Sequence, residues 1–357
     1  MYLQAVILVL IFVPAFWFNT SSSCPWFSRR RQPNHERDRK SEIPKNTVVR
    51  IQEIPIDKSL TELKCDLESL AIKDSRLEAT GKGIDGLTLA RINNDDACAT
   101  AIFPTFLSPP ELLKRLGQAS KEAGLPYAFD CDFMGITPLT DASGDDAVDI
   151  VAVPGLASHP IGSWKSSQPG NNNVWLRDFL PRDIPNSRIL LYGYDTKLLG
   201  SNSQQTIEDM SIMLLNLVSS FRADEQSKHR PIIFIGHSLG GLLVKECLLQ
   251  AMKRENYASH HAIYQACCGL LLFGVPNHGL NNEQLLRVVQ NQANESLIRA
   301  LILDKNLESS MFLKRVSSDF SERYGSHSPV VCFYETRLSP TVQVRRSKVV
   351  FRGFETN

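Results

Sequence analysis

From residue 148 onward, short continuous apolar runs alternate with stretches of helical spacing. Strands buried on both faces read as continuous apolar runs, and they are typical of parallel sheets covered by helices. Between the runs, one helix is predicted whose apolar side chains form a stripe along one face, made of Ile207, Met210, Leu214, Leu217 and Phe221. The pattern predicts an α/β unit with a mostly parallel sheet over residues 148–343. The expected strands are the runs at 149–153, 189–194, 231–235, 270–275 and 330–333.

A smaller unit with a different pattern is predicted over residues 47–134. Its leucines at positions 60, 63, 67 and 70 have helical spacing, and a second amphipathic stretch follows Pro110. Four short apolar segments flank these helices, which gives the order strand, helix, strand, strand, helix, strand. This order resembles a ferredoxin-like sandwich, the topology of RNA-recognition modules included. The expected third strand, 98–103, lacks the aromatic pattern on which such modules stack bases, so we expect a structural or partner-binding unit.

The first 20 residues include an uncharged apolar segment. Tyr2 to Phe18 contains no charged residue, and its length is at the short end of the ~17–25 residues that span a bilayer. Basic residues follow from Arg29 to Lys40, and the positive-inside rule places that side in the cytosol. We therefore predict an uncleaved transmembrane anchor over residues 1–20. A cleaved signal peptide, a mitochondrial presequence and an artefact of the gene model are the alternatives.

Three polar segments lie between or after these units. Residues 21–46 are rich in charge and contain Pro33 and Pro44, so we expect a disordered basic linker. Residues 135–147 are expected to link the two α/β units. Residues 344–357 are expected to form an atypical tail.

Composition narrows the classes of function. A hydrophobic fraction of 43% supports a sizeable core, and a net charge of +1 gives no overall attraction for nucleic acid. The eight cysteines show no zinc-binding spacing and several lie in apolar runs, so we expect reduced thiols in a cytosol-facing protein. We expect no metal, no cofactor and no nucleic-acid partner.

The clearest candidate for chemistry is the sequence Gly-His-Ser-Leu-Gly from Gly236 to Gly240. It follows a buried strand and opens a helix, which is the context in which G-x-S-x-G forms a nucleophile elbow. The sharp turn exposes the Ser238 hydroxyl, and bulky side chains at positions 236 and 240 would collide. We predict Ser238 as the nucleophile.

Two backbone N–H groups are expected to form the oxyanion hole. One belongs to Leu239, the residue after the nucleophile. The other should come from the loop after the first strand of this unit, where Pro154 has no N–H to donate. Gly155 and Leu156 both have one, and we nominate Leu156.

Six stretches of the chain together resemble a known family: 153–160 (VPGLASHP), 175–181 (WLRDFLP), 191–195 (LYGYD), 236–245 (GHSLGGLLVK), 273–279 (FGVPNHG) and 333–336 (FYET). They are similar to lipase-like serine esterases of the α/β-hydrolase fold, in particular the serine-active-site-containing protein family of mitochondria, endoplasmic reticulum and phospholipid remodelling. Fungal hydrolase domains that precede nucleotide-binding receptor modules are also similar. The resemblance implies ester hydrolysis or acyl transfer on lipid-like substrates without a cofactor. The family usually has His-Gly where this chain has Pro154 and Gly155.

The acid and the base of a catalytic triad complete the predicted site. In this fold the acid and then the histidine follow the nucleophile along the chain, and Glu335 after the run 330–333 is the expected acid. Residues 336–357 contain no histidine, so we expect a truncated, alternatively spliced or mispredicted C-terminus. His278, in the loop after the run 270–275, is the best substitute base. Less suitable positions are those of His237, His260, His261 and His327.

These expectations describe a membrane-anchored serine esterase or lipase-like hydrolase of the endoplasmic reticulum or mitochondrion. As written, it is expected to be weak or inactive because a serine hydroxyl needs a base at neutral pH. Its expected partners are a lipid or ester substrate, the membrane through residues 1–20, and a protein through residues 47–134. The alternative is a catalytically dead hydrolase-fold scaffold or sensor module.

Overall fold

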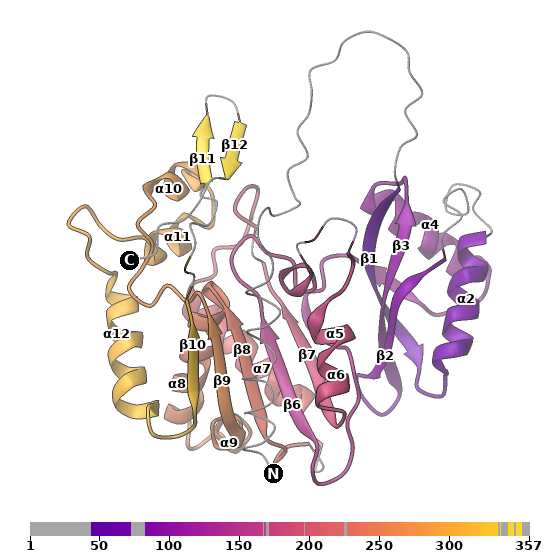
Figure 1. Ribbon diagram of the computed structural model, residues 1–357, viewed down its shortest axis with the longest axis horizontal. Helices are drawn as coiled ribbons and strands as arrows, with labels where there is room; N and C mark the ends of the chain where they lie inside the picture. The colour runs from indigo at the N-terminus through magenta and orange to yellow at the C-terminus, as the bar shows by residue number, and fades with distance from the viewer. Residues whose placement is uncertain are drawn as a thin grey trace.

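The computed structural model describes residues 44–72, 83–166, 168, 171–195, 197–224, 227–334, 336, 342–345 and 348–351. They form two α/β units that lie side by side (Figure 1). The predicted anchor at 1–20 and nearly all of the predicted linker at 21–46 lie outside these residues. None of the helices that the structure describes is both long enough and apolar enough to cross a membrane.

The first unit is a four-stranded antiparallel sheet with two helices. Its strand order is β2-β3-β1-β4, and each neighbouring pair is antiparallel. Leucines on the inner faces of the helices are fully buried against the sheet, including Leu63, Leu67 and Leu112. The elements follow the predicted order: β1 (Lys45–Pro55), α2 (Leu60–Ile72), β2 (Asp85–Arg91), β3 (Asp96–Thr105), α4 (Pro109–Glu122) and β4 (Ala128–Asp130).

The second unit contains a six-stranded sheet of order β10-β9-β8-β6-β7-β5. Its five parallel strands are the five predicted apolar runs: β6 (Val148–Val153), β7 (Ser187–Gly193), β8 (Ile232–His237), β9 (Cys267–Phe273) and β10 (Val330–Phe333). The predicted linker at 135–147 needs correction, because β5 (Gly135–Pro138) pairs antiparallel with β7. Four residues are too few to show a period, and only pairing with β7 defines them as a strand.

Helices cover both faces of this sheet. Along each strand, successive side chains point to opposite faces. On one face, Val151 and Val153 pack against α7 (Ile207–Phe221) and α8 (Leu239–Lys253). On the other, Ile150 and Ala152 pack with the short elements η1 (Gly162–Trp164), α5 (Trp175–Asp178) and α6 (Leu180–Asp183). The remaining elements on the α8 side are α9 (Ala258–Ala266), α12 (Met311–Asp319) and η2 (Phe320–Tyr324).

A small cap lies beside the sheet, at the end where its parallel strands stop (Figure 1). It consists of α10 (Glu283–Val289) and α11 (Glu295–Leu301), whose apolar side chains form their own buried cluster. Leu156, from the loop after β6, packs against this cluster. The hairpin of β11 (Val342–Arg345) and β12 (Lys348–Phe351) lies near α10. Most of this hairpin belongs to the stretch 344–357, which was predicted to be an atypical tail.

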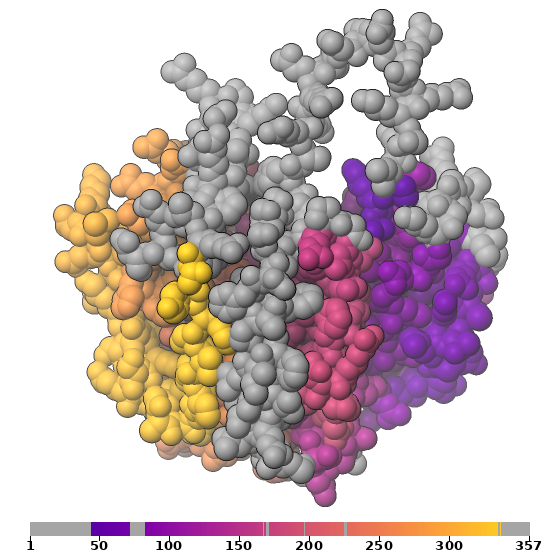
Figure 2. Space-filling view, in the orientation of Figure 1, coloured from indigo at the N-terminus to yellow at the C-terminus, as the bar shows by residue number. Residues whose placement is uncertain are grey.

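Specific contacts join the two units, which Figure 2 shows pressed against each other. Arg50 of β1 is buried and donates hydrogen bonds to the Met134 carbonyl (2.9 Å) and the Thr137 hydroxyl (3.0 Å). The Arg91 N–H donates to the Asp141 carboxylate (2.9 Å). Because Thr137 lies in β5 of the second sheet, the first unit is bonded directly to the second.

Candidate active site

Ser238 lies in the turn between β8 and α8, at the carboxyl end of a central strand. Its φ of 52° and ψ of −123° form a conformation that an L residue adopts only at a cost. The turn is held on both sides: the Ser238 N–H donates to the Phe273 carbonyl (2.8 Å), and the Ser238 carbonyl accepts from the Gly241 N–H (3.0 Å). The strained strand–turn–helix geometry predicted for a nucleophile elbow is therefore present.

Gly236 and Gly240 let this turn close. A Cβ on Gly236 would lie 2.6 Å from the Gly241 Cα, in the first turn of α8. A Cβ on Gly240 would lie 2.3 Å from the carbonyl oxygens of both Val153 and Pro154. The first contact explains the predicted need for glycine within the elbow. The second shows that Gly240 also makes room for the loop after β6, which the sequence did not reveal.

The loop after β6 packs directly against the nucleophile. A Cβ on Gly155 would lie 3.0 Å from the Ser238 Cβ. The buried Tyr194 hydroxyl donates to the Pro154 carbonyl (2.8 Å), and burial raises the pKa of Tyr194 well above its usual range, so the hydroxyl stays protonated. Leu156, the nominated oxyanion donor, comes next and is partly buried. The loop is thus held close to Ser238 from its first residues.

The second nominated donor, the Leu239 N–H, is the first of α8. The first N–H groups of a helix have no acceptor within the helix and lie at the positive end of its dipole. Leu239 is buried, which fixes this backbone in place. The amino end of α8 would therefore stabilise an oxyanion that forms beside Ser238.

The predicted acid, Glu335, lies outside the described residues. The strand that precedes Glu335 is β10. Its carboxyl end lies at the same edge of the parallel sheet as the carboxyl ends of β6, β8 and β9, and Ser238 follows β8 at that edge. The Gly274 N–H donates to the Phe333 carbonyl (2.8 Å), which ties the end of β10 to the loop after β9.

Three of the histidines lie toward the opposite edge of the sheet. His260 and His261 belong to α9, which leads into the start of β9, and His327 precedes the start of β10. The His327 Nε2 is hydrogen-bonded to the Tyr264 carbonyl (2.8 Å). These three side chains therefore lie near the amino ends of the strands, whereas the elbow lies at the carboxyl ends.

His237 and His278 lie at the same edge as Ser238. His237 is partly buried beneath the loop after β6, and a Cβ on Gly155 would lie 2.9 Å from its Nδ1. Burial lowers the pKa of His237 to about 4, so the ring is neutral at pH 7. Its position beneath the loop suits support of the backbone rather than proton transfer.

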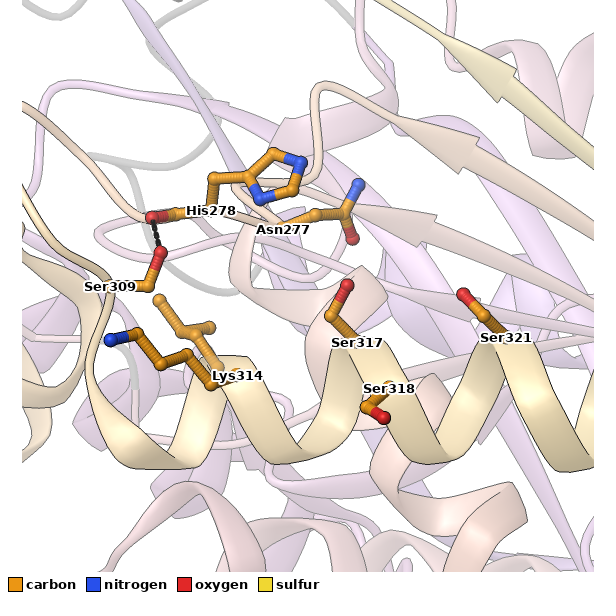
Figure 3. A pocket seen from close by; sticks show the side chains of 8 residues that line it. Asn277, His278, Ser309, Lys314, Ser317, Ser318 and Ser321 are labelled. Atoms are coloured by element: carbon orange, nitrogen blue, oxygen red, sulfur yellow. Dashed lines mark hydrogen bonds between the residues drawn. The ribbon is translucent and has the colours of Figure 1, made fainter.

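His278 is exposed and lines a pocket of about 360 Å³ between the loop after β9 and α12 (Figure 3). The Ser309 hydroxyl donates to the His278 carbonyl (2.5 Å). Ser317 and Ser321 point from α12 and η2 toward Asn277 on the other wall. The residues that line this pocket do not include Ser238, so the pocket does not unite the predicted substitute base with the nucleophile.

Two further residues of this edge were not identified as functional from the sequence. Tyr194 holds Pro154, and His159 hydrogen-bonds the Cys131 carbonyl through Nε2 (2.9 Å). Both lie in stretches that resemble the serine-esterase families, 191–195 and 153–160. That resemblance was the available signal, but it did not say what either side chain contacts.

The chain is similar in sequence to the protein SERAC1 of several vertebrates. It is 36% identical to the Danio rerio protein over 152 residues, which covers 37% of this chain and 22% of that protein. It is 33% identical to the Homo sapiens protein over 107 residues, covering 29% of this chain and 16% of that protein. The match therefore spans about a fifth of the length of these curated relatives. No family model matches the chain.

Solved bacterial lipases and esterases are remotely similar. The mature lipase BlEst2 of Bacillus licheniformis is 14% identical with a TM-score of 0.33, covering 58% of this chain and 73% of that one. Esterase B of Lactobacillus rhamnosis is 13% identical with a TM-score of 0.32, covering 56% and 68%. The fold assignment rests on the strand order, the antiparallel edge strand and the elbow after β8. The second unit therefore has the α/β-hydrolase fold, in a chain that resembles the serine-active-site-containing proteins.

Proposed function

We propose that the second unit hydrolyses or transfers acyl groups of ester substrates, with Ser238 as nucleophile. The observation that carries the proposal is the strained Ser238 turn with Gly155 of the loop after β6 packed against it. Strain of this kind persists only where the surroundings enforce it, and it is concentrated at functional sites. The sequence resemblance to SERAC1 points in the same direction.

The proposed reaction proceeds through an acyl-enzyme. The Ser238 Oγ bonds to the ester carbonyl carbon while its proton passes to a general base, and the carbonyl oxygen becomes an oxyanion. The N–H groups of Leu239 and Leu156 hold that oxyanion. Its collapse expels the alcohol, which takes up the proton, and a water molecule then releases the acid by the same steps. Glu335 is the proposed acid that orients the base.

The base sets the expected rate. Residues 336–357 contain no histidine, and His278 lines a pocket that does not include Ser238. Because His278 is not placed beside Ser238, we propose that the 357-residue polypeptide is a weak esterase, in which His278 acts as substitute base only when it moves out of this pocket toward Ser238. Without a triad member, roughly 10³–10⁴-fold catalysis over water remains, compared with about 10⁶ contributed by an intact triad.

The test is hydrolysis of short p-nitrophenyl esters and labelling by a fluorophosphonate. We expect slow turnover that Ser238→Ala abolishes and His278→Ala reduces. Rapid turnover that survives His278→Ala would show that another residue is the base. Turnover unaffected by Ser238→Ala would refute the proposed nucleophile.

A second candidate, a catalytically dead scaffold or sensor module, is favoured by how the nearby histidines are used. His159 is hydrogen-bonded to Cys131, and His237 lies beneath the loop with a lowered pKa. A folded protein with no labelling at Ser238 and no turnover would support this candidate against the esterase.

From the sequence alone, we propose that residues 1–20 anchor the protein in the membrane of the endoplasmic reticulum or mitochondrion. The uncharged run followed by arginines supports this. Alkaline carbonate should leave the full chain in the membrane pellet and should release a variant without residues 1–20. Complete extraction of the full chain would count against the anchor.

We also propose that the first unit is a ferredoxin-like sandwich that binds a protein partner.

A further inference from the structure

His159 follows β6 by six residues, and both of its ring nitrogens have partners. Its Nδ1 accepts hydrogen bonds from the backbone N–H groups of Ile161 (3.2 Å) and Gly162 (3.3 Å). A nitrogen that accepts carries no proton, so in the neutral ring the proton is on Nε2. The Nε2–H then donates to the Cys131 carbonyl (2.9 Å). The imidazole therefore joins its own loop to a segment 28 residues earlier in the chain.

The Cys131 segment is itself held by the first unit. The fully buried Phe133 ring lies edge-on to the His159 ring, with centroids 5.1 Å apart. The Arg50 guanidinium of β1 lies 5.6 Å from the Phe133 centroid and donates to the Met134 carbonyl. A Cβ on Gly193, at the end of β7, would lie 1.7 Å from the Phe133 carbonyl oxygen. This segment is thus packed between β1 and β7.

The other end of the same loop reaches the nucleophile. Tyr194 holds the Pro154 carbonyl, and Gly155 lies against Ser238. Only residues 155–158 lie between the Pro154 and His159 attachment points, and Ala157 among them has a φ of 54°. The Leu156 N–H therefore belongs to a four-residue span fixed at both ends.

We infer that His159 is a positioning residue for the Leu156 N–H, and that the first unit sets the oxyanion hole through Cys131. The inference rests on the proposed function, because it assigns the Leu156 N–H to the oxyanion. Hydrogen-bond donors stabilise a transition state only when they are held in place beforehand. A displacement of about 1 Å can cost on the order of a hundredfold in rate. His159 acts through the backbone and does not touch the reacting atoms.

Two substitutions separate the two bonds of the ring. His159→Asn keeps an acceptor for the N–H groups two and three residues later, as asparagine does in Asx turns, but is too short to reach Cys131. His159→Gln has an amide that can reach Cys131 and loses the acceptor near Ile161. The matched control is His327→Asn, which removes an equivalent bond, from Nε2 to the Tyr264 carbonyl, at the opposite edge of the sheet.

The first readout is amide hydrogen exchange of residues 155–158 in the full chain. We expect His159→Asn to accelerate exchange there roughly tenfold or more, and His159→Gln less. His327→Asn should leave exchange in this span at the wild-type rate. If His159→Asn changes it no more than the control does, or if His159→Gln is the more impaired variant, the inference is wrong.

The second readout is the reaction at Ser238. For p-nitrophenyl esters we expect His159→Asn to lower kcat roughly tenfold to a hundredfold with little change in KM. Fluorophosphonate labelling should slow in parallel, and His327→Asn should change neither. A wild-type kcat in His159→Asn would overturn the inference. A wild-type protein that neither turns over nor labels refutes the proposed function instead, and hydrogen exchange still decides whether His159 positions the loop.

Discussion

Single atoms decide the geometry around Ser238. α8 lies so close to the carbonyls of Val153 and Pro154 that a Cβ on Gly240 would be 2.3 Å from both oxygens. Gly155 is in a similar but less crowded position, because a Cβ there would lie 2.9 Å from the His237 Nδ1 and 3.0 Å from the Ser238 Cβ. The elbow and the loop after β6 therefore approach each other so closely that a side chain at Gly240 would collide with the backbone of the loop.

Gly240→Ala should destabilise the protein and move the loop after β6. The new Cβ would lie 2.3 Å from two carbonyl oxygens, and overpacking of this kind typically costs about 1–3 kcal/mol. The matched control is Gly117→Ala in α4, where a Cβ meets nothing within 4 Å, so helix propensity should stabilise by up to about 1 kcal/mol. Urea unfolding of both variants checks the opposite signs. Equal effects would show that the Gly240 contact yields easily.

His237 should make stability depend on pH. Its pKa falls from the usual 6.5 to about 4 on folding, because burial disfavours the charged ring. The unfolded chain therefore binds the proton first, and stability is lost as the pH falls from about 6.5 to about 4. The contribution is at most roughly 3 kcal/mol. Unfolding of His237→Gln should be less sensitive to pH in this window; an unchanged pH profile would contradict the assignment.

At the scale of elements, buried charge joins the starts of three strands. Asp149 at the beginning of β6 is fully buried and pairs with Arg188 of β7 (2.8 Å), with Arg222 after α7, and with Arg230 before β8 (3.3 Å). The sequence predicted only an apolar strand here. A carboxylate inside such a run requires charged partners, but their identity depends on which strands become neighbours.

Asp149→Asn should be among the most destabilising substitutions in the second unit. It keeps the shape but leaves the buried Arg222 without its counter-charge, and breaking a buried pair costs about 3–5 kcal/mol. Glu308→Gln removes the exposed pair with Lys314 (2.6 Å) and should cost no more than about 1 kcal/mol. Denaturant midpoints of the two variants test the contrast. A small loss for Asp149→Asn would mean that the arginines find other partners.

At the scale of the whole molecule, the two units are expected to unfold together. Arg50 is 6% exposed and donates hydrogen bonds to Asp130 within the first unit and to the Thr137 hydroxyl of β5 in the second. Together with the bond between His159 and Cys131, it couples the first sheet to the second.

Arg50→Met should weaken this coupling. It removes the bonds to Met134 and Thr137, and the ion pair with Asp130 within the first unit, while keeping apolar contact with Phe133. We expect one calorimetric unfolding transition in the wild-type protein, and two separated transitions or a markedly lower midpoint in the variant. A wild type that already unfolds in two independent steps would refute the coupling.

Much of the architecture could be predicted because it is encoded locally. Five apolar runs gave five parallel strands, and the Gly236–Gly240 sequence gave a strained turn at Ser238. Finer detail was less accurate: in α7 the fully buried side chains include Leu215 and Val218, whereas the predicted Leu217 and Phe221 are only partly buried. The helix is rotated slightly relative to the predicted stripe, because the sheet and α8 decide which side chains fit.

The sequence by itself determined the five parallel strands, the elbow and its glycines, since each depends on residues close together in the chain. Tertiary structure alone decided the rest. β5 became a strand by pairing with β7, and His159 found the carbonyl of Cys131. His278 came to line a pocket against α12. Spacing along the chain specifies the faces of helices and strands, whereas contacts between distant segments depend on which elements pack together, and only the folded chain fixes that choice.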